Sequence, residues 1–262
     1  MVGNSALLAV FIIRSRTANC PSRAASFAQQ SGTYGDLERF GQLSGRFVAA
    51  LSVLGGHMSR QVQIGQSTFG CPCHACAFFH SRDEEYELLL PFSKSGEETG
   101  DRLFQVVDKA HLAERRQRLA AGGINVEQAE RKGQLELRPW EDAYLRRNRF
   151  DQDAMLELIE AVLKDGRAKG FGMTRLWANM EWALNDLPGV HDIVEYETRL
   201  NKFLPNYDDV VVCTYDLNKF SAPVVMDIMR THPQVIVGGV LQENPFYVPP
   251  DEFLSELSRR TH

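Results

Sequence analysis

The stretch Asp209-Val-Val-Val-Cys-Thr-Tyr215 is an unbroken, mainly apolar run, and it decides the fold class. A half-exposed strand alternates apolar and polar residues, whereas a strand buried on both faces of a parallel sheet is apolar almost throughout. Amphipathic helical patterns flank the run at 190–204 and around 224–229. The run is therefore predicted to be a strand that helices cover on both faces.

The same alternation of strand and helix extends outward through most of the chain. We expect further strands at 76–80, 102–107, 134–138, 174–178 and 234–238, and helices at 84–99, 109–121, 125–132, 151–169 and 250–259. Strands separated by helices of about 10 to 20 residues imply right-handed βαβ crossovers. The predicted fold class is α/β, a doubly wound and mostly parallel sheet, with residues 65–260 as one domain.

Residues 1–57 differ from the rest in composition. They contain no Lys, are rich in Ser, Ala, Gly and Arg, and show no sustained helical or strand period. Their apolar run at 6–13 has basic residues after it rather than before it, which is the wrong order for a signal peptide. We expect a poorly ordered, weakly structured extension, and a native protein that begins at Met58.

Composition and charge exclude several classes of protein. The 262 residues are 44% hydrophobic and 24% charged, which excludes disordered, collagen-like and coiled-coil chains. The net charge is −5, and an acidic domain without a basic stripe is a poor direct binder of nucleic acid. The longest apolar run is far short of the roughly 20 residues that span a bilayer, so no membrane association is expected.

Five cysteines, three of them within six residues, do not form a disulfide framework and predict a cytoplasmic protein.

Polar and aromatic side chains follow the predicted strands, where ligands bind in open parallel sheets. We predict a ligand-binding rim of His80 and Arg82 after the first strand, Asp108 after the second, Trp140 after the third, Glu181 and Trp182 after the fourth, Asp216 after the fifth and Glu243 after the sixth. If the first and fourth strands are neighbours in the sheet, one pocket forms between them, lined by His80, Arg82, Glu181 and Trp182. The alternative is that these are ordinary loop side chains that cap strand ends.

Glu197 is a further candidate for ligand contact. Ile193, Leu200 and Leu204 place it on the apolar face of its helix, where an unpaired carboxylate is costly. The alternative is a position at the edge of that face, with the carboxylate in solvent.

No phosphate-binding loop follows the first strand. The turn at 80–86 reads His-Ser-Arg-Asp-Glu-Glu-Tyr, without the glycines and lysine of a phosphate cradle, and its three acidic residues would repel a triphosphate. The chain also lacks a Gly-x-Gly-x-x-Gly after a strand and a Gly-x-Ser-x-Gly elbow. We therefore expect no cofactor and no enzymatic activity. The alternative is a degenerate nucleotide-binding ATPase or hydrolase with Glu181 as general base.

The segment Cys71-Pro-Cys-His-Ala-Cys76 is the sharpest local motif. Cys73 and Cys76 have the C-x-x-C spacing that lets two thiolates share a metal ion or form a redox disulfide. His74 and His80 are the nearby residues that would complete a metal site. The alternative is that Cys76 is a buried strand residue and Cys73 an incidental loop residue.

Several blocks between residues 70 and 258 together resemble a known family. They are His74-Ala-Cys-Ala-Phe-Phe-His-Ser-Arg-Asp-Glu-Glu-Tyr86, Leu90-Pro-Phe92, the segment 123–136, Met180-Glu-Trp-Ala-Leu184, Tyr196-Glu197, Leu200-Asn201, Tyr215-Asp216, Phe220-Ser221 and His232-Pro233. This set resembles the MEDS family, a sensory domain named for methanogens, methylotrophs and a dichloromethane-responsive regulator. The family pattern has Gly-Glu where this chain has Ala178-Asn179.

The resemblance implies a RecA/KaiC-like core, a three-layer sandwich of the broad Rossmann type that has lost its phosphate loop. It also implies a role in sensing small organic molecules, next to DNA-binding or kinase modules. The leading hypothesis is a stand-alone sensory domain that binds a small organic ligand and signals through a regulatory protein partner, a kinase or a transcription regulator. A metal or redox sensor based on Cys73, His74 and Cys76 is a further alternative.

Overall fold

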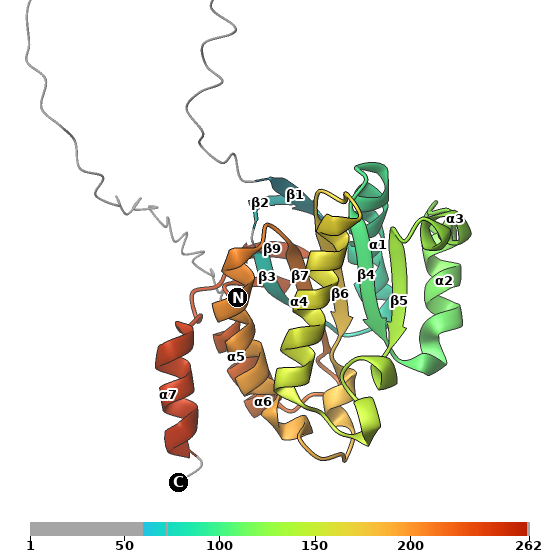
Figure 1. Cartoon of the computed structure of the whole chain (residues 1–262). Helices are drawn as coiled ribbons and strands as arrows, with labels where there is room; N and C mark the ends of the chain where they lie inside the picture. The colour runs from blue at the N-terminus through green and yellow to red at the C-terminus, as the bar shows by residue number, and fades with distance from the viewer. Residues whose placement is uncertain (1–59, 72, 261–262) are drawn as a thin grey trace, which may run out of the picture. The chain divides into compact units, whose positions relative to one another are not determined.

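The computed structural model describes residues 60–71 and 73–260 (Figure 1). The predictions for residues 1–57 and for a start at Met58 lie outside the described residues. The described chain contains a two-stranded hairpin, β1 (Gln61–Ile64) and β2 (Ser67–Gly70), and a seven-stranded sheet in the order β5-β4-β6-β7-β3-β8-β9. The strands of that sheet are β3 (Cys73–Phe79), β4 (Arg102–Val107), β5 (Leu135–Pro139), β6 (Thr174–Asn179), β7 (Val210–Asp216), β8 (Gln234–Val237) and β9 (Val240–Glu243).

The predicted α/β class with a doubly wound, mostly parallel sheet is confirmed. Every pair of neighbouring strands in the large sheet is parallel except β8 and β9. The apolar run that suggested this class is β7, which lies between β6 and β3 and is buried from Val210 to Tyr215. A strand in that position has neighbours on both edges and helices over both faces, so it needs apolar side chains in both directions.

Helices cover both faces of the sheet (Figure 1). On one face lie α1 (Arg82–Glu98), α2 (Leu112–Ala121) and α3 (Val126–Arg131), whose apolar side chains pack with Ala75 and Ala77 of β3 and Leu103 of β4. On the other lie α4 (Gln152–Ala168), α5 (Ile193–Phe203) and α6 (Ala222–Thr231), which pack with Cys76 and Phe78. Helix α7 (Pro250–Arg260) packs against α5 and α6.

Short 3-10 turns fill several connections between these elements. They are Lys109–His111, Trp140–Asp142, Arg146–Asn148, Glu181–Leu184, Val190–Asp192 and Leu204–Asn206. Within the described residues, none of the helices combines the length and the apolar character needed to cross a bilayer.

Strand β9 is absent from the sequence prediction. Gly238 and Gly239 both have positive φ, 57° and 75°, as a two-residue hairpin turn requires. The chain therefore reverses after β8, and β9 runs antiparallel to it with Glu243 opposite Gln234. Residues that follow β8 are thereby carried back toward the amino ends of the parallel strands.

Candidate functional site

The carboxyl ends of β3, β4, β6 and β7 meet at one edge of the sheet, as predicted for the rim. Arg82 and Glu181 line two small crevices there, joined by Asp108 in one crevice and by Asp216 in the other. Each crevice has a volume of about 10 Å³, which is room for a single water molecule. Lys219 occupies the surface above them, with its Nζ 2.6 Å from Glu181 and 3.4 Å from Asp216. The rim residues thus meet at a polar surface that leaves almost no open space for a ligand.

The predicted pocket of four residues is wrong in its arrangement. Strands β3 and β6 are not neighbours, because the doubly buried strand β7 lies between them. His80 lies on an exposed turn and lines neither crevice. Trp182 is fully buried, with its ring stacked on Tyr144 at 4.5 Å and 4.4 Å from the ring of Phe150, so it belongs to the core.

The remaining rim residues divide between the two edges of the sheet. Trp140 lies at the carboxyl edge, where its indole N–H donates to the carbonyl of Asn179 at 3.2 Å. The prediction for Glu243 is wrong in position, because β9 reverses direction and places Glu243 beside Gln234 at the amino edge. It lines a separate hollow there with residues of β2.

A buried carboxylate fills the space behind the crevices. Glu85, in the first turn of α1, accepts hydrogen bonds from the Trp177 indole at 2.6 Å and the Thr214 hydroxyl at 2.9 Å. The Arg115 guanidinium lies 3.7 Å from it and stacks on the Trp177 ring at 3.6 Å. The N-terminus of α1 is capped by the Ser81 hydroxyl, which accepts from the Glu84 N–H at 3.2 Å. Protein groups therefore occupy the end of the helix where a nucleotide-binding fold holds phosphate.

The C-x-x-C motif does not form a paired site. Strand β3 begins at Cys73, so Cys73 and Cys76 are both strand residues three positions apart and point to opposite faces of the sheet. Both thiols are buried, and burial raises the pKa of each well above its usual range. The alternative in which Cys73, His74 and Cys76 share one metal ion is therefore excluded by the strand geometry, and the loop position expected for Cys73 is wrong.

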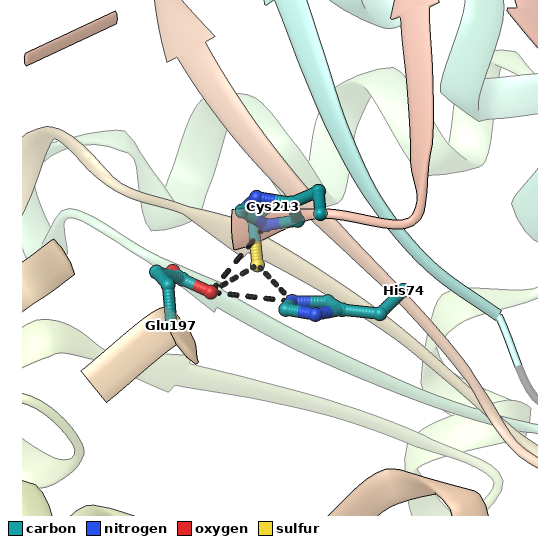
Figure 2. A group of neighbouring side chains, drawn as sticks. His74, Glu197 and Cys213 are labelled. Atoms are coloured by element: carbon teal, nitrogen blue, oxygen red, sulfur yellow. Dashed lines mark hydrogen bonds and ion pairs between the residues drawn. The ribbon is translucent and has the colours of Figure 1, made fainter. Parts of the chain in front are cut away.

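The structure instead brings His74 together with three residues from distant parts of the chain (Figure 2). His74 lies on β3, Cys213 on β7, Glu197 on α5, and His232 directly after α6. One ligand-type atom from each of the four lies within 4.8 Å of the others, and all four residues are buried. Glu197 Oε2 is 3.2 Å from His74 Nε2 and 3.4 Å from His232 Nε2. The Cys213 sulfur is 3.6 Å from His74 Nε2 and 3.7 Å from Glu197 Oε2.

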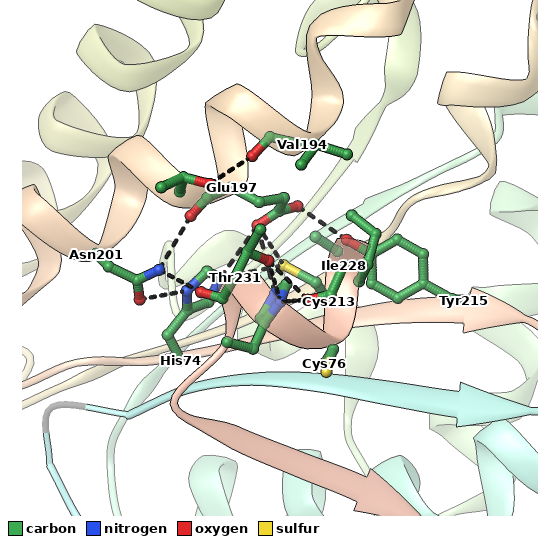
Figure 3. Close-up of polar contacts among 12 residues, drawn as sticks. His74, Cys76, Val194, Glu197, Asn201, Cys213, Tyr215, Ile228 and Thr231 are labelled. Carbon is green, nitrogen blue, oxygen red and sulfur yellow. Dashed lines mark hydrogen bonds and ion pairs between the residues drawn. The ribbon is translucent and has the colours of Figure 1, made fainter. Parts of the chain in front are cut away.

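Hydrogen bonds to a second set of residues orient this buried cluster, which we define as His74, Glu197, Cys213 and His232 (Figure 3). The Asn201 amide nitrogen donates to the carbonyls of Glu197 and Thr231, so its oxygen faces His74 Nδ1 at 3.0 Å. Because an amide oxygen only accepts, His74 Nδ1 carries a proton and donates it.

The other two orienting bonds are equally directional. His232 Nδ1 lies 2.9 Å from the carbonyl oxygen of Ile228, which also only accepts, and 2.7 Å from the Thr231 hydroxyl, which donates its own proton to the same carbonyl, so this nitrogen is a donor as well. The Tyr215 hydroxyl donates to Glu197 Oε1 at 3.0 Å and leaves Oε2 facing the histidines. Both Nε2 atoms, one carboxylate oxygen and the sulfur therefore point to a common centre.

The electrostatics of the buried cluster favour an ionised carboxylate. Burial by itself would raise the pKa of Glu197, but its contacts with the imidazoles of His232 and His74, when these carry a second proton on Nε2, outweigh burial and lower the pKa to about 2. Burial, and then the neighbouring His74, lower the pKa of His232. Burial, and then the charge of Glu197, raise the pKa of the Cys213 thiol well above its usual range.

Cys213 and His232 are not among the site residues predicted from sequence. Each stands within or next to an apolar segment, which is a weak signal because buried cysteines and histidines are common. The two histidines of the cluster are 158 residues apart in the chain. The sequence names the other two members: Glu197, because a carboxylate on an apolar helix face needs a partner, and His74, as a candidate metal ligand beside Cys73 and Cys76.

Comparison with known proteins agrees with this architecture. The chain is 26% identical over 160 residues to the transcriptional repressor DcmR of Methylorubrum extorquens, a match that covers 61% of this chain and 57% of that protein, so little more than half of the relative's length is represented. Among solved structures, the KaiC-like protein PH0186 of Pyrococcus horikoshii OT3 has a similar fold, with a TM-score of 0.51 and 19% identity over 68% of this chain and 79% of that one.

The family assignment follows from a direct match to a family model. The model of MEDS, the methanogen/methylotroph, DcmR sensory domain, matches residues 73–233, from the start of β3 to the residue before β8. This match covers more than half of the chain, and the KaiC-like neighbour supports a RecA-like core. The chain belongs to the MEDS family of sensory domains.

Proposed function

We propose that the chain senses a small organic molecule and passes the signal to a regulatory protein partner, a kinase or a transcription regulator. Membership of a sensory family and similarity to a transcriptional repressor support this role. The partner module is either a separate protein or another part of a longer chain.

The cavity at the amino end of β3 carries the proposal. Its volume is about 120 Å³, against about 10 Å³ for each crevice at the rim. Two hollows within the described residues are larger, at about 800 Å³ beside α5 and α7 and about 300 Å³ beside β2 and β9, but neither is lined by a residue of the buried cluster. The cavity at β3 is well above the size that a single water molecule needs and suits a ligand of a few non-hydrogen atoms. It is lined by Cys73, His74, Asn201, Leu204, Pro205, Pro233, Gln234 and Tyr247.

This cavity adjoins the buried cluster through His74, and this contact gives a route for the signal. His74 and Asn201 line the cavity and also join β3 to α5 through their hydrogen bond. Asn201 continues the connection to the end of α6 through the carbonyl of Thr231. A ligand that displaces either side chain changes how α5 and α6 are held on the sheet.

The test is a ligand screen on the full chain followed by two variants. The probes are alcohols, carboxylates, amides and halogenated methanes with one to four carbons, ranked by the rise in melting temperature and then titrated by calorimetry. Tyr247→Trp narrows the cavity without touching the buried cluster, and we expect it to abolish binding of any hit. Arg82→Gln alters the rim and should leave that binding unchanged.

Two results would contradict the cavity as the ligand site. The first is a hit that survives Tyr247→Trp and is lost in Arg82→Gln, which would move the site to the rim of Arg82, Asp108, Glu181 and Asp216. The second is a screen in which no probe raises the melting temperature of the folded protein.

A further inference from the structure

We infer that the buried cluster is a binding site for one divalent transition-metal ion, and that its donor set fits zinc. The four ligands would be His74 Nε2, Glu197 Oε2, Cys213 Sγ and His232 Nε2. The inference does not depend on the proposed ligand cavity, because it is tested by metal content alone.

Four of the six distances within the buried cluster already match a tetrahedral site. Zinc bonds of about 2.0 Å to nitrogen or oxygen and about 2.3 Å to sulfur place neighbouring donors about 3.3 Å apart, or about 3.5 Å when one is sulfur. Glu197 Oε2 lies 3.2 and 3.4 Å from the two histidine nitrogens. The Cys213 sulfur lies 3.6 and 3.7 Å from His74 and Glu197. The two remaining pairs, His232 with His74 and His232 with Cys213, lie within 4.8 Å, so the His232 ring is the ligand that would move inward to close the site.

In their neutral form, both histidines direct the lone pair of Nε2 inward. Asn201 and the carbonyl of Ile228 hold the two Nδ1–H groups from outside, and metal-binding histidines are typically held in this way. Within the described residues, His232 Nε2 is buried without a hydrogen-bond partner. A buried nitrogen with an unused lone pair is costly, and a metal ion at the common centre would satisfy it.

Charge balance also favours a divalent ion. A thiolate and a carboxylate together carry two negative charges, so a divalent cation with two neutral histidines makes the buried site neutral. Nitrogen and sulfur donors are typical of zinc and related transition metals, whereas calcium and magnesium prefer all-oxygen sites. Metal binding must displace the Cys213 thiol proton, so uptake releases a proton and weakens as the pH falls.

Four protein ligands close the coordination sphere, which is typical of a structural rather than a catalytic ion. The ion would connect two neighbouring strands, β3 and β7, to α5 and to the end of α6. Loss of the ion would then loosen the helices of one face from the sheet.

The experiment measures metal in the full chain purified without added metal. Elemental analysis should find about one zinc ion per chain. After removal by a chelator, the folded protein should take up Co²⁺ and show the near-ultraviolet thiolate-to-cobalt charge-transfer band. A folded wild-type protein that binds neither zinc nor cobalt stoichiometrically would overturn the inference.

Variants then locate the ion. Cys213→Ser should remove the cobalt band, whereas Cys76→Ser, at the neighbouring buried thiol on β3, should keep it. Tyr215→Phe should weaken metal affinity by about 10- to 100-fold, because it frees the carboxylate that the hydroxyl orients. A band that persists in Cys213→Ser would place the metal elsewhere and refute the site.

If Cys213→Ser does not fold, His232→Gln replaces it as the decisive variant. Its amide side chain is similar in size to imidazole, and folding is checked by circular dichroism. Loss of stoichiometric metal from folded His232→Gln supports the site, and full retention contradicts it. If neither variant folds, the cobalt spectrum of the wild-type protein decides.

Discussion

Replacement of Glu197 by Gln should change how the stability of the metal-free protein depends on pH. The pKa of Glu197 in the folded protein is about 2, against an ordinary value of 4.5. At about 1.4 kcal/mol per pH unit, the ionised carboxylate contributes about 3 kcal/mol to the free energy of unfolding at neutral pH. Glu197→Gln should remove that contribution.

The direction of the pH dependence follows from the sign of the shift. Because the pKa of Glu197 is lower in the folded state, the unfolded chain takes up the proton first. The stabilisation is complete above about pH 4.5 and is lost as the pH falls toward 2. The lowered pKa of His232 adds a loss of stability that begins below its ordinary value of 6.5. Glu197→Gln should still lose stability through His232 as the pH falls, but it should not show the loss that protonation of Glu197 causes in the wild type.

Urea unfolding followed by tryptophan fluorescence measures the difference, since Trp177 and Trp182 are buried. The stability gap between wild type and Glu197→Gln should be about 3 kcal/mol at neutral pH and should narrow steadily below about pH 4.5. A gap that stays constant down to about pH 3 would refute this reasoning.

Glu256→Gln is the matched control. The pKa of Glu256 is also about 2, because hydrogen bonds from Arg230 and Arg260 lower it, but this carboxylate lies at the surface. High salt should therefore abolish the effect of Glu256→Gln and leave that of Glu197→Gln in place.

Three further predictions follow from the fold. Cys73→Ser and Cys76→Ser should each cost about 1 to 3 kcal/mol in urea unfolding, because both buried thiols face apolar side chains; a silent Cys73→Ser would contradict its place in the strand. Gly189→Ala should cost at least about 2 kcal/mol, because φ is +84° and a Cβ would lie 2.3 Å from the carbonyl oxygen of Phe150; a variant as stable as wild type would show that the turn relaxes freely. Calorimetric titration with Mg-ATP should show no binding, since the turn at 80–86 has no glycine or lysine to hold phosphate; micromolar affinity would revive the nucleotide-binding alternative.

Local sequence pattern was sufficient for the parallel strands and the helices that cover them, and for the family, but not for β1, β2 and β9. The strand predicted at 102–107 has the same bounds as β4, and the helix predicted at 151–169 is α4 within a residue at each end. These segments were readable because the periods of buried side chains, two in strands and 3.6 in helices, are properties of neighbouring residues. The blocks that resemble the MEDS family also lie along the chain and need no knowledge of contacts.

The order of the strands was decided only in three dimensions. Strand β7 comes late in the chain and still inserts between β6 and β3, which separates Glu181 from His80. Right-handed crossovers limit the possible topologies but leave strand order to the packing of whole helices on the sheet. The position of Glu243 likewise depended on two glycines that reverse the chain.

The buried cluster could not be read from spacing at all. A strand that is buried on both faces shows no alternation, so the sequence does not reveal which face Cys73, His74 or Cys76 occupies. Successive residues of a strand point to opposite faces of the sheet, so a shift of one residue exchanges the faces. Cys73 and Cys76 therefore lie on opposite faces. His74 lies on the same face as Cys76, where it contacts Glu197 and Cys213. The four residue types of the site can thus be found in the sequence, but the sequence does not show that they meet. Tertiary packing alone brings them into contact, because His74 and His232 are 158 residues apart in the chain.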